Sequence, residues 1–219
     1  MKYASYRLTG DERIPAVVSI GDRETPVWMQ QLWDEGEWAE FIVRNGCGHC
    51  CCAMALRLFG VDIDPHAEYS LCRSLWGEPE KEGEHRQGNF QSIVGIVKIL
   101  TRFGVPAQCY GVADRDEAAS HIDSALREGK TVIFESHPTE DFPGNPFSTG
   151  EHWVMAVGYT ENGEILIANS SLRAVKTGIQ LVDIDTVRRA LYLGSSPEDM
   201  TWGEWRDEFK HGTGYIIVG

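Results

Sequence analysis

The sequence predicts an α+β fold, because its helical patterns come early and most of its strand patterns come later. Helical patterns occupy much of residues 47–128, and apolar runs typical of strands follow over residues 131–168. Regular alternation of strands and helices would instead favour a doubly wound parallel sheet. The chain has 219 residues, a length that suits one domain. We therefore expect residues 1–219 to form a single domain with a helical half and a sheet half.

Two helices carry clear end signals. The first is expected over Cys47–Phe59, because Gly60 stands where a glycine commonly ends a helix. The second is expected over Pro65–Leu75, where proline suits the first helical position and Asp64 can cap the free N–H groups. The periodicity of apolar residues and the turn residues predict three more helices, over Asn89–Phe103, Arg115–Glu128 and Val182–Leu193. The charged stretch Glu78–Arg86 predicts a surface loop.

The strongest strand signal is a hairpin. Asn162-Gly163 separates the apolar runs Trp153–Tyr159 and Ile165–Ala168, and this dipeptide favours a tight hairpin turn. Other apolar runs predict strands over Ala16–Ile20, Val27–Gln31, Gln108–Val112, Thr131–Glu135 and Gly214–Val218. The segment Ser136–Gly150 is rich in proline and glycine, so we expect a long irregular loop that borders a binding site.

Composition and charge exclude several classes of function. The formal net charge of −13 repels nucleic acid, and no basic stripe offsets it. No apolar run approaches the roughly 20 residues of a membrane-spanning helix, and Met1–Pro15 lacks the apolar core of an export signal. Four of the six cysteines lie within residues 47–52, where helical neighbours cannot pair with one another. We expect a soluble cytoplasmic protein without nucleic-acid or membrane partners, although a chain trimmed of an export signal would look the same.

The first candidate for chemistry is Cys47, at the start of the first expected helix. The unpaired N–H groups and the dipole at a helix N-terminus favour a thiolate. A thiolate is a nucleophile, and a neighbouring imidazole activates it further.

The expected hairpin supplies the second half of a catalytic arrangement. His152 precedes its first strand, and Asn169 follows its second strand. A hairpin brings these two ends close together. The asparagine can then accept a hydrogen bond from one ring nitrogen, while the other nitrogen faces a thiol.

Several segments together resemble those of one known family. Asn45-Gly46-Cys47-Gly48 and the helix after it, with Ala53, Met54, Leu56 and Gly60, look like the nucleophile helix of the bacteriocin-processing (double-glycine leader) cysteine peptidases and their stand-alone relatives. Residues 151–159 resemble the histidine strand of papain-like enzymes, and residues 165–170 are similar to their asparagine strand. The stretches 88–104 and 125–129 look like the family's middle region. The resemblance therefore covers roughly residues 27–170.

The resemblance implies a papain-like fold and a hydrolase that acts on peptide or amide bonds through a thioester. Its implied triad is Cys47, His152 and Asn169, although many relatives have aspartate at the last position. A glutamine upstream of the cysteine would help to stabilise the oxyanion, with Gln31 as first candidate and Gln30 as second. The interval from this glutamine to Cys47 is longer than is usual in the family. A peptide or protein is the implied substrate, with no cofactor and no metal.

Three alternatives remain at the level of sequence. Cys47-Gly48-His49-Cys50 also resembles the papain segment in which the later cysteine is the nucleophile, which would place Cys50 in that role. The same residues have ligand-like spacing, so a Cys-cluster metal-binding protein is a rival, although a structural zinc site normally needs a second ligand pair. A catalytically inactive papain-fold binding module is the third.

Overall fold

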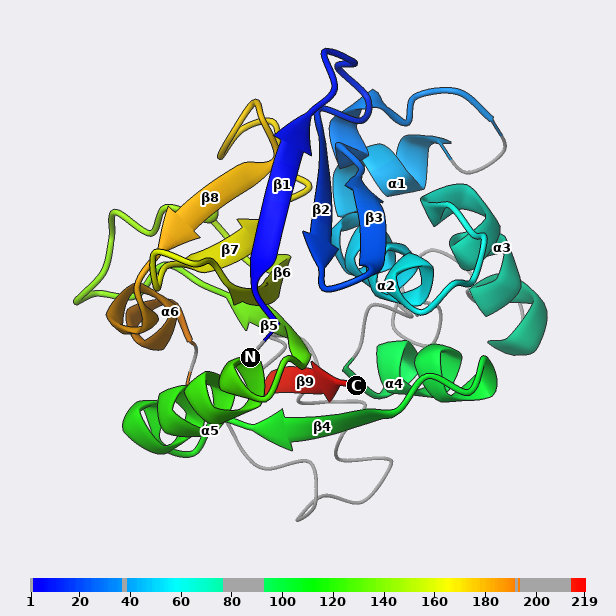
Figure 1. The fold of residues 1–219 in the computed structure, drawn as a ribbon. Helices are drawn as coiled ribbons and strands as arrows, with labels where there is room; N and C mark the ends of the chain where they lie inside the picture. The colour runs from blue at the N-terminus through cyan, green and yellow to red at the C-terminus, as the bar shows by residue number, and fades with distance from the viewer. Residues whose placement is uncertain (1, 37–38, 77–92, 192, 194–213) are drawn as a thin grey trace.

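The computed structural model describes residues 2–36, 39–76, 93–191, 193 and 214–219. Within them, helices pack against two antiparallel sheets, so the predicted α+β class is confirmed (Figure 1). The expected loop Glu78–Arg86 and residues 89–92 of the helix expected from Asn89 lie outside the described residues. No helix in the described part of the chain is long and apolar enough to cross a membrane.

The larger sheet carries most of the sequence-predicted strands. Its strand order is β4-β9-β5-β6-β7-β8, and every neighbouring pair is antiparallel. These strands are β4 (Ala107–Gly111), β5 (Thr131–Ser136), β6 (His152–Tyr159), β7 (Ile165–Ala168), β8 (Ile179–Val182) and β9 (Gly214–Val218). The predicted hairpin is therefore β6 and β7. A smaller antiparallel sheet contains β1 (Ala4–Leu8), β2 (Ala16–Ile20) and β3 (Arg23–Val27).

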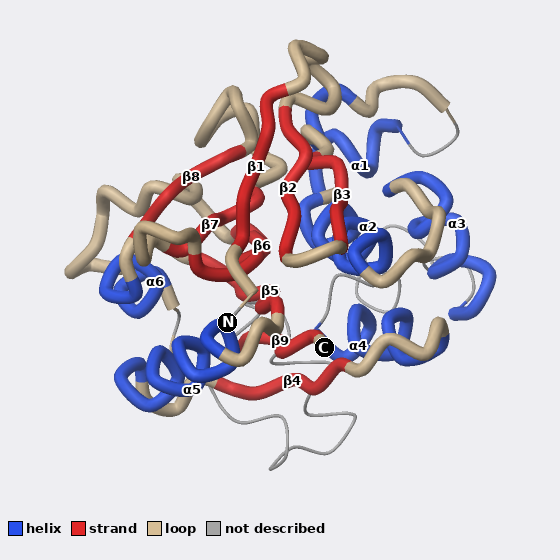
Figure 2. The backbone as a smooth tube through the Cα atoms, in the orientation of Figure 1, coloured by secondary structure: helices blue, strands red, loops and turns tan. Residues whose placement is uncertain are grey.

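The helices form two groups. Most of them, α1 to α4, lie on the right of the view in Figures 1 and 2, whereas α5 and α6 lie at the lower left. Their bounds are α1 (Ala39–Asn45), α2 (Cys47–Leu58), α3 (Pro65–Trp76), α4 (Ile93–Arg102), α5 (Arg115–Arg127) and α6 (Ile184–Ala190). A short 3₁₀ helix, η1 (Gln30–Leu32), precedes α1. Helix α2 begins and ends close to the predicted residues. Gly60, just beyond its end, has a positive φ of 82°, which glycine adopts at little cost.

Two apolar cores lie on opposite faces of β6. Trp153, Met155 and Val157 belong to a core that also contains residues of α2, α3, α4 and the small sheet, and within it β6 contacts α2, β1 and β2. Val154 and Ala156 pack with α5 and α6. All eight residues of β6 are buried. This central strand therefore fixes the position of α2 relative to the sheet that carries the predicted histidine.

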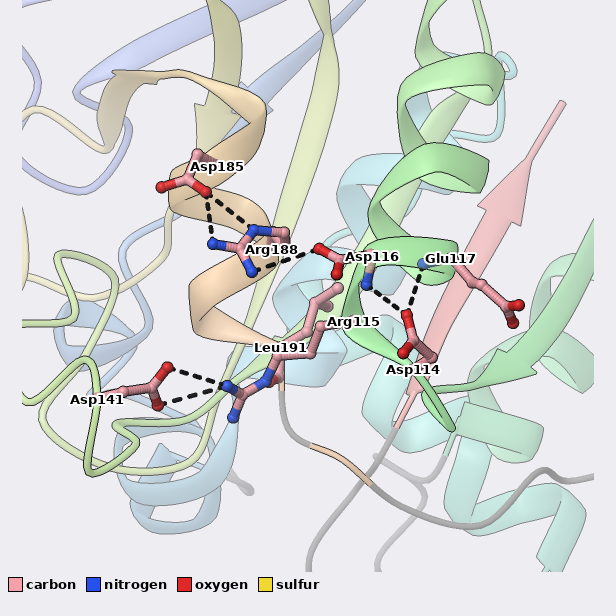
Figure 3. Close-up of polar contacts among 8 residues, drawn as sticks. All are labelled: Asp114, Arg115, Asp116, Glu117, Asp141, Asp185, Arg188 and Leu191. Atoms are coloured by element: carbon pink, nitrogen blue, oxygen red, sulfur yellow. Dashed lines mark hydrogen bonds and ion pairs between the residues drawn. The ribbon is translucent and has the colours of Figure 1, made fainter.

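Polar contacts hold α5, α6 and the loop of residues 137–151 together (Figure 3). Arg115 donates to the carbonyl of Leu191 at 2.8 Å and forms an ion pair with Asp141 in the loop at 3.3 Å. Arg188 on α6 bridges Asp185, at 2.7 Å, and Asp116 on α5, at 3.4 Å. These contacts restrain the loop that continues toward β6.

Several boundary predictions were wrong. Val27–Gln31 is not a strand, because β3 ends at Val27 and η1 begins at Gln30. The helix predicted from Val182 begins instead at Ile184, where Asp183 caps it by accepting from the N–H of Thr186. Val182 belongs to β8. The elements β1, β3, β8, η1 and α1 were not predicted, because their sequence patterns are short or mixed.

Candidate active site

Gly46 shapes the connection between α1 and α2. Its N–H donates to the carbonyl of Ile42 at 2.8 Å, so α2 begins immediately after α1 ends. A Cβ atom on this residue would lie 2.4 Å from the same carbonyl oxygen, a distance that real contacts do not tolerate. Glycine is therefore required here, and it places Cys47 in the first turn of α2.

Cys47 is partly exposed and lies against the start of β6. Enclosure by the protein raises the pKa of its thiol to about 11, while a backbone hydrogen bond from Trp153 opposes that rise. Ionisation of Glu135 would raise the pKa of Cys47 further. Trp153 directly follows His152 in the sequence. The contact between Cys47 and the Trp153 backbone therefore places the predicted nucleophile beside the residue that follows the predicted base.

His152 and Asn169 meet as predicted. The Nε2 atom of His152 lies 2.8 Å from Oδ1 of Asn169, and both side chains are buried. This bond uses one ring nitrogen and leaves Nδ1 as the nitrogen able to exchange a proton with a thiol. Burial lowers the pKa of His152 to about 4, and the bond to Asn169 only partly offsets this. The imidazole is therefore neutral at neutral pH and can accept a proton.

The orientation of Asn169 is fixed by both ends of its amide. Its Nδ2 donates to the carbonyl of Phe147 at 3.0 Å and to Oε1 of Gln180 at 2.8 Å. Its Oδ1 also accepts from the N–H of Ser171 at 2.9 Å. Gln180 in turn donates to the carbonyl of Pro146 at 2.7 Å. The irregular loop and β8 thus hold the asparagine with its oxygen toward His152.

No sequence pattern predicted a role for Gln180. It lies on β8 opposite Ile167 of β7, so its support of Asn169 depends on strand pairing. The only signal in the sequence was a polar residue inside an otherwise apolar run.

The two candidate glutamines have different environments. Gln30 is buried, its Nε2 donates to the carbonyl of Val43 at 3.3 Å, and its Oε1 lies 3.4 Å from the Ser170 hydroxyl. Gln31 is partly exposed, and its Oε1 accepts from the N–H of Leu172 at 2.9 Å. That contact fixes the carbonyl end of the Gln31 amide and leaves its NH₂ end as the one that can donate elsewhere.

Cys50 is unlike Cys47 in its surroundings. Cys50 is fully buried, and burial raises the pKa of its thiol. A hydrogen bond with the side chain of Ser170 partly offsets this increase. A fully buried thiol cannot reach an external substrate without a change in the structure, whereas Cys47 is partly exposed at the helix start.

Glu135 is a second residue that the sequence analysis missed. It is 5% exposed, its Oε2 has no hydrogen-bond partner in the described part of the chain, and it lies opposite Trp153 on the neighbouring strand. Burial, followed by the charge of Glu151, raises the pKa of Glu135 well above its usual value. An acidic group is thus enclosed beside Cys47, where the sequence suggested only a buried strand.

The chain belongs to the peptidase C39-like family, whose model matches residues 26–196. The predicted division is observed, with a helical half that carries Cys47 and an antiparallel half that carries His152 and Asn169. Family membership supports a peptidase in the broad sense. No curated protein matches the chain.

Two solved structures are similar to this chain at low identity. One is a double glycine motif protease from an AMS/PCAT transporter in complex with the leader peptide. It shares 14% identity with a TM-score of 0.41, over 78% of this chain and 81% of that chain. The other is a putative C39-like peptidase from Bacillus anthracis. It shares 14% identity with a TM-score of 0.42, over 80% of this chain and 88% of that chain.

Proposed function

We propose that this chain is a cysteine peptidase that cleaves peptide or amide bonds with Cys47 as nucleophile, His152 as base and Asn169 as the residue that orients the base. The observation that carries the proposal is the hydrogen bond between buried His152 and Asn169, formed directly beside the backbone contact between Trp153 and Cys47. The family match supports the same class of reaction.

The chemistry follows from the roles of these three groups. Nδ1 of neutral His152 accepts the thiol proton as the Cys47 sulfur attacks the substrate carbonyl carbon. The imidazolium then donates that proton to the leaving amine as the C–N bond breaks, and a thioester on Cys47 remains. Water attacks the thioester with His152 again as base, which releases the acid and restores the thiol. The bond from Asn169 holds the ring in position throughout.

Stabilisation of the oxyanion is assigned to the backbone N–H of Cys47 and the side chain of Gln31. The helix start provides the first donor, because the N-terminal end of a helix favours the negative charge that develops on the substrate oxygen. Gln31 is preferred over Gln30, since the amide nitrogen of Gln30 already donates to Val43. Removing one such donor costs about 3 kcal/mol in the activation barrier.

A labelling experiment separates this proposal from an inactive binding module. The full chain with Cys109→Ser, which removes the other partly exposed thiol, is treated briefly with dilute iodoacetamide and the modified residue is mapped. We expect a single label on Cys47, formed about 10²-fold more slowly when His152→Ala is added, because the base no longer accepts the thiol proton.

The opposite result would contradict the proposed role of His152. Equal labelling rates with and without His152, in variants that both retain native near-ultraviolet circular dichroism, would show that the imidazole does not activate Cys47. The chain would then be better described as a binding module with the peptidase fold.

A further inference from the structure

A second cluster of chemically reactive side chains lies on the other side of α2. His49 follows Cys47 by two residues, which turns its side chain about 200° around the helix. It therefore faces α3, which packs against α2, and not the start of β6. His49, Glu68 and Cys72 are each no more than 1% exposed, and none takes part in the proposed peptidase chemistry.

The donor atoms of these three residues converge. His49 Nδ1 lies 2.5 Å from Glu68 Oε2, and Cys72 Sγ lies 3.2 Å from Glu68 Oε1. One ligand atom from each of the three residues can be chosen so that all lie within 4.8 Å of one another. Bond lengths of about 2.0–2.3 Å around tetrahedral zinc place neighbouring ligand atoms about 3.3–3.8 Å apart. The cluster needs only small side-chain adjustments to reach that spacing.

Cys52 can supply a fourth donor by turning its side chain toward the group, since its sulfur is not among the atoms that all lie within 4.8 Å of one another. It is fully buried, and its thiol is within hydrogen-bonding reach of Glu68. His49 and Cys52 are three residues apart on α2, while Glu68 and Cys72 are four residues apart on α3. Each spacing puts a pair of side chains on one face of its helix. The second ligand pair, absent from the sequence pattern around Cys47, is thus provided by the neighbouring helix.

One polar atom of this cluster has no hydrogen-bond partner among the described residues. It is the Nε2 atom of His49, which is buried. The ring is enclosed by Tyr69, at 4.8 Å between ring centroids, and by Phe41, at 5.9 Å. A partly satisfied buried network is a costly feature of a core. A bound cation would use the carboxylate, the sulfurs and Nδ1 of the imidazole as ligands, and it would leave Nε2 as it is.

We propose that His49, Cys52, Glu68 and Cys72 form a structural zinc site that joins α2 to α3. Mixed sulfur, nitrogen and oxygen donors suit zinc, and four buried protein ligands describe a closed structural site. Binding requires both thiols as thiolates, so two protons are released to solvent when the zinc ion enters. The site would stabilise the helix that begins with Cys47 without taking part in bond cleavage.

Metal analysis of the purified full chain tests this proposal. The protein is produced with zinc in the medium, passed over a desalting column and examined by native mass spectrometry. We expect about one zinc ion per chain, and competition with a chromophoric chelator should show that Cys72→Ser or Glu68→Gln weakens binding by at least about 10²-fold. Cobalt added to the metal-free protein should give thiolate-to-metal absorption that Cys72→Ser reduces.

Cys51→Ser is the matched control, because Cys51 is a fully buried thiol on the same helix outside the cluster. It should keep the zinc stoichiometry of the unaltered chain. The proposal is overturned if the unaltered chain binds no zinc, or if Cys51→Ser and Cys72→Ser lose zinc equally. Glu68→Gln keeps the side-chain shape, so it reports on the ligand even if a cysteine variant folds poorly. Metal content is measured without any activity assay, so this result is independent of the proposed peptidase function.

Discussion

Two clusters of polar side chains lie on opposite sides of α2, and they are built in different ways. Cys47 contacts the backbone of Trp153, and the neighbouring His152 contacts Asn169, so this cluster joins segments that are far apart in the sequence. His49 meets Glu68, which lies only 19 residues away on the next helix. The first cluster depends on the pairing of strands, whereas the second depends on the packing of two neighbouring helices.

The difference teaches how one helix can serve two purposes. The thiol at the start of α2 is partly exposed, as the proposed nucleophile must be, while His49 and Cys52 are buried. A reactive group must be reachable, but a structural ligand is best enclosed. Changes to one cluster should therefore have little effect on the function of the other.

The largest expected effect separates the clusters by activity. Cys47→Ala should lower the cleavage of fluorogenic peptide amides by at least about 10³-fold, because the nucleophile is lost. It should leave zinc content unchanged. Cys72→Ala should do the reverse, with turnover kept within about threefold at temperatures where the variant is folded, because independent sites behave additively. Loss of turnover and of zinc in both variants would contradict the separation.

The second effect concerns acid stability on the active-site side. The pKa of folded His152 is about 4, below the ordinary value of 6.5, so the unfolded chain binds the extra proton first as pH falls. Stability should therefore decrease from about pH 6.5 to pH 4, by about 3 kcal/mol in total. Urea unfolding of the unaltered chain and of His152→Gln measures this, since the glutamine variant should lack that part of the decrease. Identical slopes would mean that His152 is not buried as a neutral ring.

A third effect sharpens the account of Asn169. Asn169→Asp removes the two N–H donors that meet the carbonyl of Phe147 and Oε1 of Gln180. We expect a loss of about 2–3 kcal/mol in the free energy of unfolding, because these acceptors would face a carboxylate. Asn145→Asp is the matched control. Its amide donates to the Ser136 hydroxyl, which can rotate and donate to a carboxylate instead. An equal loss in the free energy of unfolding in both variants would contradict the view that the Asn169 amide is specifically required.

The smallest effect compares two buried glutamates, Glu135 and Glu68. Burial and the charge of Glu151 raise the pKa of Glu135, so the folded state holds a proton that the unfolded chain releases above about pH 4.3. Stability thus falls as pH rises from that value, and Glu135→Gln should add about 1 kcal/mol at neutral pH. Glu68→Gln should destabilise instead, because Glu68 accepts from His49 and Cys72. Thermal unfolding at pH 7 compares the two, and stabilisation by both changes would contradict this distinction.

The sequence predicted those parts of the site that depend on local patterns. The Asn162-Gly163 turn determines the hairpin, and the hairpin determines that His152 and Asn169 meet. Gly46 and Gly60 mark the two ends of α2 for reasons visible in the backbone. These features follow from a few neighbouring residues, so they could be recognised without the rest of the chain.

The remaining features depend on contacts between distant segments. Gln180 supports Asn169 only because β8 pairs with β7. Strand β8 was not predicted, because its last residue, Val182, was assigned to the helix expected after it. Glu68 and Cys72 face His49 only because α3 packs on one particular side of α2. Periodicity predicts which residues share a face of one helix. It does not predict which face of another helix they will meet.

The most direct measurement for the central claim is capture of the acyl-enzyme. The full chain is mixed with 4-nitrophenyl acetate, quenched in acid, and the acetylated residue is mapped by mass spectrometry. We predict one acetyl group on Cys47, removable by neutral hydroxylamine as a thioester, and formed much more slowly with His152→Ala. Acetylation spread over lysines with none on Cys47, or an equal rate without His152, would contradict a nucleophile–base pair at this site.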